Sequence, residues 1–432
     1  MKLKKYYFLF LFFLFHVLCK SGCPCSGSMV GGSYLRVMQL GYGWLIPDEQ
    51  VDAIYNPATL NDIIGNRFFS GFYGNMYYDY ELNKYDKYFN SNFFWVLPFN
   101  EIKIAVKYSP EIKTLKRKTA YYMSNSSVDN FEFLSFVGFH PIENIKLGLS
   151  FGVNTFYDFI LDDYYSSTND TFNKTIAENY LVNTGVVFNI NNYFNLGFSF
   201  GSSLGTSKKT NNGLITQDND LKLYGYILPE FKIKKNSETM LFRTLLSVSY
   251  ESILTDYENE LYPDNVERYY NLGSEIGAAL YYELKDKTIL TCGLKSDWTI
   301  KNIIRSFGIG VVDTQSHDGF ELTVFAGLEK PVIVDWIILR TGYKIIKIYD
   351  KNYIFKREIW GYHIYKIPAN RFKIEIFPDF TENFSFGIGV KLGNNIILNM
   401  DLGDMSYEIL TTEIEKYKVK MQINAEINFI FE

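Results

Sequence analysis

Few side chains in this 432-residue sequence are of the kinds that perform catalysis. Three histidines follow the first twenty-one residues, His140, His317 and His363, and no nucleophile motif such as Gly-x-Ser-x-Gly accompanies any of them. A histidine acts as a general base only when a nucleophile and an orienting group lie within hydrogen-bond reach. We interpret the three as loop or interface residues, and we predict no catalytic residue and no enzyme activity.

Metal-binding and disulfide patterns are equally weak. The sequence contains no His-x-x-x-His and no Cys-x-x-Cys pair, which are the spacings at which zinc is commonly held. Cys23 and Cys25 flank a single proline and Cys292 stands alone, so no disulfide framework is expected. Acid-rich stretches such as residues 256–260 are better interpreted as solvated surface than as calcium sites. The sequence therefore predicts no bound metal and no cofactor.

One short segment carries a pattern that could bind a ligand. Asn56 is a favourable helix N-cap and Pro57 a favourable first helical residue, so a short helix should begin there. The free backbone N–H groups of such a helix end attract a negatively charged group. A simple capped helix before the first strand would show the same residues, and the capping pattern alone does not separate the two interpretations.

Most of the remaining sequence alternates between apolar and polar residues. In residues 419–431 every second residue is apolar, and the residues between them are polar except for Ile430. Since successive side chains of a strand point to opposite faces, this segment has one apolar and one polar face. A tilted strand crosses a bilayer with about 9 to 11 residues, so the segment is long enough to do so. The pattern predicts the closing strand of an outer-membrane β-barrel.

Paired alternating segments recur along the chain and are joined by very short polar turns. The predicted turns are at residues 141–144, 191–192, 285–287 and 393–395. Longer polar stretches, expected to be loops, lie near residues 160–177, 206–220, 252–267 and 350–370. Short turns that alternate with long loops are typical of outer-membrane barrels. We predict an all-β, antiparallel barrel of about fourteen and up to sixteen strands, since residues 303–312 are compatible with either a strand or a loop.

The composition fits this fold. Aromatic residues make up 18% of the chain, including 35 Tyr and 37 Phe, and membrane barrels use such rings as girdles at both water interfaces. A secreted β-sandwich or propeller is the alternative fold. Repeated glycines inside the strands, such as Gly148 and Gly197, are expected to let the wall bend or to admit a neighbouring backbone.

The first residues predict export. Three of the first five residues are lysine, and the apolar run that follows, residues 6–19, is too short for the ~20 residues of a spanning helix. We assign residues 1–21 as a signal peptide. Its removal takes four lysines and no acid from a chain of net charge −5 and leaves −9, which argues against nucleic acid as a partner. Lipid attachment at Cys19 or Cys23 stays open, although their neighbours fit a lipoprotein cleavage site poorly.

Residues 48–60 resemble a family signature. The stretch Asp-Ala-Ile-Tyr-Asn-Pro-Ala at residues 52–58 looks like the "D-A-x-A-x-Y-x-NPAGL" motif that opens the FadL-type fatty-acid transporters and their PorV-like relatives. Gly-Gly-Ser-Tyr-Leu-Arg at residues 31–36 and the segment 327–343 are similar to further PorV-like patterns. The resemblance extends over nearly the whole chain that follows the signal peptide.

The resemblance implies a fourteen-stranded barrel whose lumen is closed by an N-terminal plug, with hydrophobic ligands passing this plug. On the matching positions, Asn56, Pro57 and Ala58 would form the plug turn, and Asp48 and Asp52 would lie close by.

The chain departs from the family pattern at three places. Thr59 stands where the pattern has glycine, Gly-Tyr-Gly-Trp at residues 41–44 replaces the usual Met-Gly-Gly-Ala region, and Glu432 follows the last aromatic residue. The first two departures affect the expected ligand route. The third shifts the expected assembly signal inward by one residue.

The sequence thus predicts three segments: a signal peptide at residues 1–21, a plug segment at 22–65 and a barrel at 66–432. The expected location is the bacterial outer membrane, with lipid as its surroundings and the barrel-assembly machinery as a partner. No nucleic acid partner is expected.

Two functions remain open. The first is passive transport of hydrophobic small molecules such as long-chain fatty acids, which predicts an apolar cavity near residues 56–58 and an opening through the wall. The alternative is a PorV-like, non-transport partner of a secretion or surface-attachment system, which predicts a sealed lumen and binding at the outer face. A general porin is a weaker third hypothesis, because the N-terminal segment would obstruct a water channel.

Overall fold

The computed structural model describes most of the chain between Leu40 and Phe431. The described residues are Leu40 and 45–431, apart from the segments 80–83, 100, 119–121, 165–170, 212–213, 259–265, 308–310, 334–335, 360–361, 370–383, 393–395 and 402–417. The predicted signal peptide, both predicted sites of lipid attachment and the turn at 393–395 lie outside the described residues.

In the described residues from 45 onward, two short helices precede the strands. The elements are α3 (Glu49–Tyr55), η2 (Pro57–Asp62), β1 (Asn66–Asp79), β2 (Lys84–Phe99), β3 (Ile102–Lys118), β4 (Tyr122–Ile142), β5 (Ile145–Tyr164), β6 (Thr171–Asn191), β7 (Phe194–Asn211), β8 (Leu214–Lys235), β9 (Glu238–Glu258), β10 (Val266–Glu283), β11 (Ile289–Phe307), β12 (Val311–Ile333), β13 (Ile337–Ile359), β14 (Tyr362–Ala369), β15 (Phe384–Leu392), β16 (Ile396–Asp401) and β17 (Lys418–Phe431). No helix of the described chain is long and apolar enough to cross a membrane.

All described strands belong to one antiparallel sheet. From β1 to β13 each strand pairs with the next strand along the chain. Both β14 and β15 pair with β13, at different heights, and β12 occupies the other edge of that strand. The seventeen described strands therefore fill sixteen positions, the upper end of the predicted range.

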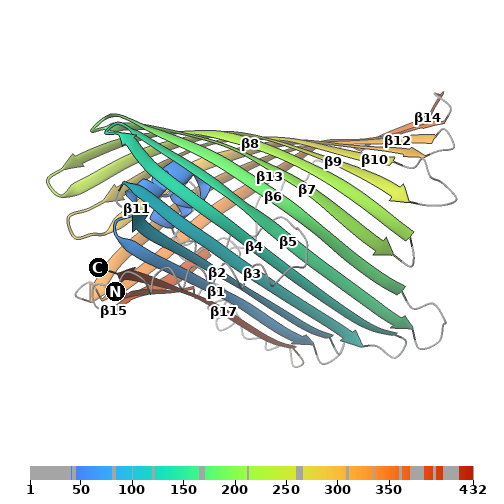
Figure 1. The fold of residues 1–432 in the computed structure, drawn as a ribbon, viewed down its shortest axis with the longest axis horizontal. Coiled ribbons are helices and arrows are strands. Elements are labelled where there is room, and N and C mark those ends of the chain that lie inside the picture. The colour runs from blue at the N-terminus through green and yellow to red at the C-terminus, as the bar shows by residue number, and fades with distance from the viewer. Residues whose placement is uncertain are drawn as a thin grey trace.

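The sheet curves round so that its last strand meets its first, as Figure 1 shows. β17 pairs with β1 along its whole length, from Phe431 opposite Asn66 to Lys418 opposite Asp79. Near the end with the short turns the pairs β13–β15, β15–β16 and β16–β17 complete a ring. Farther from this end the pairs among the described residues do not complete a ring. The predicted all-β, antiparallel barrel is confirmed, and the sandwich and propeller are excluded.

The turns and loops differ from the prediction in one respect. The short turns at 141–144, 191–192 and 285–287 lie between strands as predicted, but most of the stretches expected to be long loops are strand. Strands such as β6 have 21 residues, about twice what crossing a bilayer takes. Beyond the apolar belt the outward positions become polar, for example Glu178 and Lys208. The apolar alternation of the outward positions therefore stops before the strand itself ends.

The two faces of the sheet have opposite character. On the outer face, large apolar side chains are exposed, including Phe151, Val182, Phe200, Leu204, Phe242, Val248, Ile276 and Leu294. Facing the interior, polar side chains such as Asn154, Asn183, Arg243, Lys295 and Thr323 are buried. An apolar outer band around a polar interior is the arrangement of a membrane-spanning β-barrel.

Arg340 stabilises the region where the ring closes. Its guanidinium donates from Nε to Glu329 Oε2 at 2.6 Å and from Nη1 to Asn399 Oδ1 at 2.7 Å, which links β12, β13 and β16. The Arg340 side chain is only 2% exposed. A Cβ at position 389 would lie 2.8 Å from the guanidinium, so Gly389 leaves room for this side chain.

Replacing Arg340 by methionine should lower the stability of the folded barrel. Removing one partner of a buried ion pair leaves an uncompensated charge and costs about 3–5 kcal/mol. We expect the temperature at which the purified barrel loses its compact, fast-migrating band in detergent gels to fall. Arg305→Met is the matched control, since the Arg305 side chain is 36% exposed and its pair with Glu267 should contribute little. Equal falls in the two variants would contradict the structural role of Arg340.

Candidate functional site

The two helices lie inside the barrel, close to the end with the short turns, where Figure 1 shows them in blue. Asp48 caps α3: its Oδ1 accepts the backbone N–H groups of Gln50 and Val51 at 3.1 and 3.2 Å. Glu49 and Asp52 lie in the first turn, where negative charge interacts favourably with the helix dipole. Residues 45–62, the part of the predicted plug segment that contains the two helices, are called the plug segment from here on.

Asn56 joins the two helices. Its backbone N–H donates to the carbonyl oxygen of Asp52 and so closes the last turn of α3. Its side-chain Oδ1 accepts the N–H of Ala58 at 3.1 Å, which caps η2. The same side chain donates from Nδ2 to the carbonyl oxygen of Phe198 on β7 at 3.2 Å. One amide therefore fixes the turn and ties it to the wall, and the residue is only 2% exposed. The predicted helix start at Asn56 and Pro57 is confirmed, as a 3-10 helix.

Two further wall side chains contact the residue before this turn. Asn183 on β6 donates from Nδ2 to the carbonyl oxygen of Tyr55 at 2.9 Å, and Ser199 Oγ on β7 lies 3.1 Å from the same oxygen. Asn183 Oδ1 and Ser199 Oγ are hydrogen-bonded to each other at 2.7 Å. The last carbonyl of α3, which no helical N–H can satisfy, thus finds its partners on the wall.

A row of glycines makes room for the turn. Gly138, Gly148 and Gly185 lie directly opposite one another on β4, β5 and β6. A Cβ at position 148 would overlap the backbone of Pro57 and Ala58, and one at 185 would overlap the amide of Asn56. Gly148 thus admits a neighbouring backbone, as the sequence analysis proposed for glycines inside these strands.

Apolar contacts hold the two ends of the plug segment against different parts of the wall. One cluster joins Leu45, Ile46 and Val51 to residues of β8 to β12, among them Leu245 and Phe325. A second joins Ala53, Leu60 and Ile63 to Phe94 and other residues of β1 to β4. Leu45, Ile46, Ala53, Leu60 and Ile63 have no exposed surface. The plug segment is therefore wedged across the interior.

An ion cluster connects α3 to the opposite wall. Arg243 on β9 donates to both carboxylate oxygens of Asp52, at 2.8 and 3.0 Å, and also to Glu230 Oε2 on β8, at 2.7 Å from Nη2. The Arg243 side chain is 5% exposed. Burial raises the pKa of Asp52 to about 6, although the Arg243 guanidinium opposes the shift. Two partly buried carboxylates thus share one buried cation.

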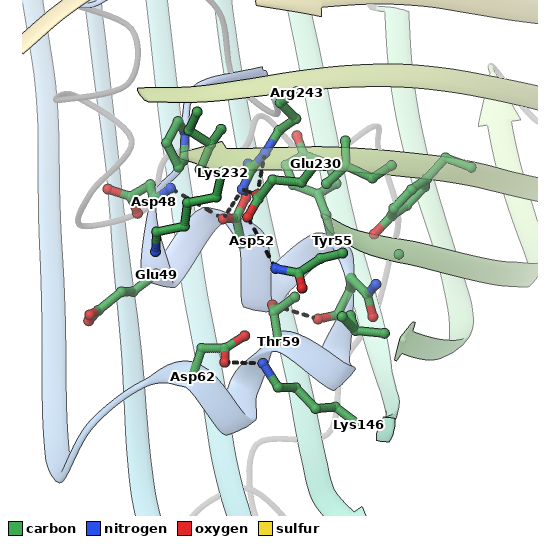
Figure 2. A pocket seen from close by; sticks show the side chains of 18 residues that line it. Asp48, Glu49, Asp52, Tyr55, Thr59, Asp62, Lys146, Glu230, Lys232 and Arg243 are labelled. Carbon is green, nitrogen blue, oxygen red and sulfur yellow. Dashed lines mark hydrogen bonds and ion pairs between the residues drawn. The ribbon is translucent and has the colours of Figure 1, made fainter. Parts of the chain in front are cut away.

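A cavity of about 380 Å³ lies between the plug segment and the wall, shown in Figure 2. Charged groups from both sides line it, including Asp48, Asp52, Lys146, Lys232 and Arg243. Apolar side chains complete the lining, among them Val187, Leu228 and Leu241. The sequence predicted an apolar cavity near residues 56–58; the cavity is there, and its lining is mixed.

The structure brings together all five predicted site residues. Asp48, Asp52 and Asn56 line the cavity, and Pro57 and Ala58 follow in the buried first turn of η2. Their role in ligand binding stays a prediction.

Sequence reasoning missed Arg243, Glu230, Asn183, Ser199 and the helix α3. The Asp48 cap was a usable indication of α3. Arg243 could have been noticed as a charge between Leu241 and Leu245, which share its face of β9.

In the described chain, the acidic, histidine and cysteine side chains form no group of three that could hold a metal ion. His140 Nε2 lies 2.9 Å from the carbonyl oxygen of Glu143 in a short turn, and His317 lies in β12.

Comparison with known proteins gives similarities in structure only. No family model and no curated protein matches the sequence. A FadL homologue of Pseudomonas aeruginosa is 11% identical over 95% of this chain and 100% of its own, with a TM-score of 0.42. The toluene transporter TodX of Pseudomonas putida is 9% identical over 90% and 96%, also at 0.42. The ferric citrate transporter FecA is 10% identical over 78% and 65%, at 0.36.

FadL-type channels, which the plug residues resemble, are thus among the similar structures. The comparisons do not test the resemblance to the PorV-like branch. What this chain does has to be inferred from its own residues.

Proposed function

We propose that the protein is an outer-membrane channel through which hydrophobic small molecules diffuse, with residues 45–62 as its plug. The apolar outer band supports the location in a membrane, since a hydrocarbon surrounding is what such a face requires. The outer membrane is the location in which barrels of this type are found. Lipid is then the direct surrounding of the wall, and insertion by the barrel-assembly machinery is part of the same proposal.

The observation that carries the proposal is an apolar hollow on the outer face of the wall, at strands whose inner face contacts the plug segment. It measures about 470 Å³ and is lined by apolar side chains of β6 to β9, including Phe198, Phe200, Leu246 and Val248. Ser199 and Tyr226 also line it, and Tyr226 lines the inner cavity as well. A hydrophobic molecule would find binding space on both sides of the wall at the same strands.

The packing of the plug segment favours the second candidate, a non-transport, PorV-like partner of a secretion or surface-attachment system. The apolar residues at both ends of the plug segment are fully buried, which fits a lumen that stays sealed. In that case the long strands beyond the apolar belt would hold client proteins at the outer face.

Uptake decides between the two. We expect uptake of a labelled long-chain fatty acid, or of another compound in a panel of hydrophobic molecules, to depend on the protein. The variant Asn56→Ala with Pro57→Ala should change that uptake at matched surface levels, because it removes the cap and the wall contact of the turn. Equal uptake in cells with the protein, without it and with the variant would contradict transport of those compounds. Steady ion conductance of the unmodified protein in planar bilayers would instead favour a porin.

A further inference from the structure

Arg243 is shared between the plug and the wall. It makes two hydrogen bonds to Asp52 on α3, and from Nε and Nη2 it makes two to Glu230 Oε2, at 3.1 and 2.7 Å. Glu230 is held in addition by Asn195 Nδ2, at 3.4 Å from Oε1. The wall acid thus keeps its position without help from the plug.

This arrangement changes what happens when the ion pair breaks. Removing one partner of an ordinary buried ion pair leaves the other charge without compensation. Here Arg243 would still have Glu230 if Asp52 moved away, since both reside on the neighbouring strands β8 and β9. The wall therefore tolerates the departure of α3 far better than a single pair would.

The two helices are fixed to the wall by different means. η2 contacts β3 to β6, and its first turn lies against the glycine row. The Asp52–Arg243 pair attaches α3 to β9, Val51 and the residues before it pack on β8 to β12, and Ala53 packs on β1 to β4. Asn56 between the helices has extended backbone angles, φ −125° and ψ 99°. Because its side chain holds the start of η2 to β7, Asn56 is the fixed point about which α3 would turn relative to η2.

We propose that Arg243 is a releasable latch, which binds Asp52 while α3 is docked and retains Glu230 when α3 turns away from β8 and β9 about Asn56. The latch rests on the proposed function only because α3 belongs to the segment that serves as the plug. Release of α3 opens the cavity between the plug segment and the wall, whereas η2 stays in the glycine row.

The latch should respond to pH in a direction opposite to that of a simple ion pair. The titratable and charged groups around Asp52 are Asp48, the N-cap of its helix, Tyr226 and Glu230 on β8, and Arg243 on β9. The docked pKa of about 6 lies above the ordinary value of 3.8, so the docked state binds the proton more tightly. Docking is therefore stabilised below pH 6 and weakened as pH rises through 6.

Hydrogen exchange of residues 45–56 tests the latch in the purified full-length barrel, without any ligand. Arg243→Met should speed exchange of α3 at least tenfold, because the plug acid loses its partner. Glu230→Gln should slow it, because β8 then offers Arg243 a neutral amide in place of a carboxylate when α3 leaves. Asp52→Asn should abolish the pH dependence that remains after correction for intrinsic exchange rates. Arg305→Met, whose partner is Glu267, is the matched control and should change nothing in α3.

The opposite signs of the Arg243 and Glu230 variants distinguish the latch from a static cluster. Faster exchange in both, or no change in both, would overturn it. Should Arg243→Met fail to give a folded barrel, the Glu230 and Asp52 variants decide alone. Because hydrogen exchange is measured without any ligand, its result is independent of the uptake experiment. Opposite changes of exchange in the Arg243 and Glu230 variants, without uptake of hydrophobic molecules, would support the latch and contradict transport. Uptake without these opposite changes would support transport and contradict the latch.

Discussion

Replacing Gly148 by valine should expel the plug turn from the wall while leaving the barrel folded. A Cβ at this position would overlap the backbone of Pro57 and Ala58, and a backbone cannot yield by changing a rotamer. Overpacking costs about 1–3 kcal/mol where side chains can adjust, and more where they cannot. The strand itself should accept valine, which suits β-structure. We expect the peptide covering residues 49–62 to lose its protection from hydrogen exchange almost completely.

The matched control is Gly225→Ala on β8. Its new Cβ would meet nothing closer than 3.6 Å, an ordinary van der Waals distance. Protection of the plug and the fast-migrating gel band should both match those of the unmodified protein. In cells, Gly148→Val should also admit a large hydrophilic dye that the unmodified protein excludes. Full protection of residues 49–62 in Gly148→Val would show that the turn does not lie in the glycine row.

The sequence was informative wherever the physical cause is local. Alternation in the strands depends only on neighbouring residues, so the barrel could be predicted from the period of two. The turn at Asn56 and Pro57 was predictable for the same reason, since a cap acts on N–H groups two residues away. The outer halves of the strands were mistaken for loops because both of their faces contact water, so that no apolar period marks them.

The contacts that position the plug could not be predicted in this way. Arg243 lies 191 residues from Asp52 in sequence and becomes its partner only through the register of the intervening strands. The glycine row is likewise set by register, which places Gly138 and Gly185 opposite Gly148. Sequence shows that a wall position is small, but only the packed structure shows which backbone occupies the space.

Replacing Asn56 by aspartate should make docking of the plug turn depend on pH. The carboxylate can still accept the N–H of Ala58, so the cap of η2 is retained. It cannot donate to the carbonyl oxygen of Phe198, and an ionised oxygen would face that carbonyl in a site only 2% exposed. Leaving a buried acceptor without its donor costs about 1–3 kcal/mol, and more beside a charge. At pH 8 we expect residues 55–62 to exchange at least tenfold faster than in the unmodified protein.

Acid should restore the protection of this variant. Burial disfavours the charged carboxylate, so the pKa of the new aspartate would be raised in the docked state, and docking gains stability as pH falls through it. A protonated carboxyl can donate to Phe198 as the amide does. Asn56→Ala is the matched comparison: it loses cap and donor together and should be equally unprotected at every pH. If the aspartate variant stayed as protected as the unmodified protein at pH 8, the Asn56–Phe198 bond would not hold the plug.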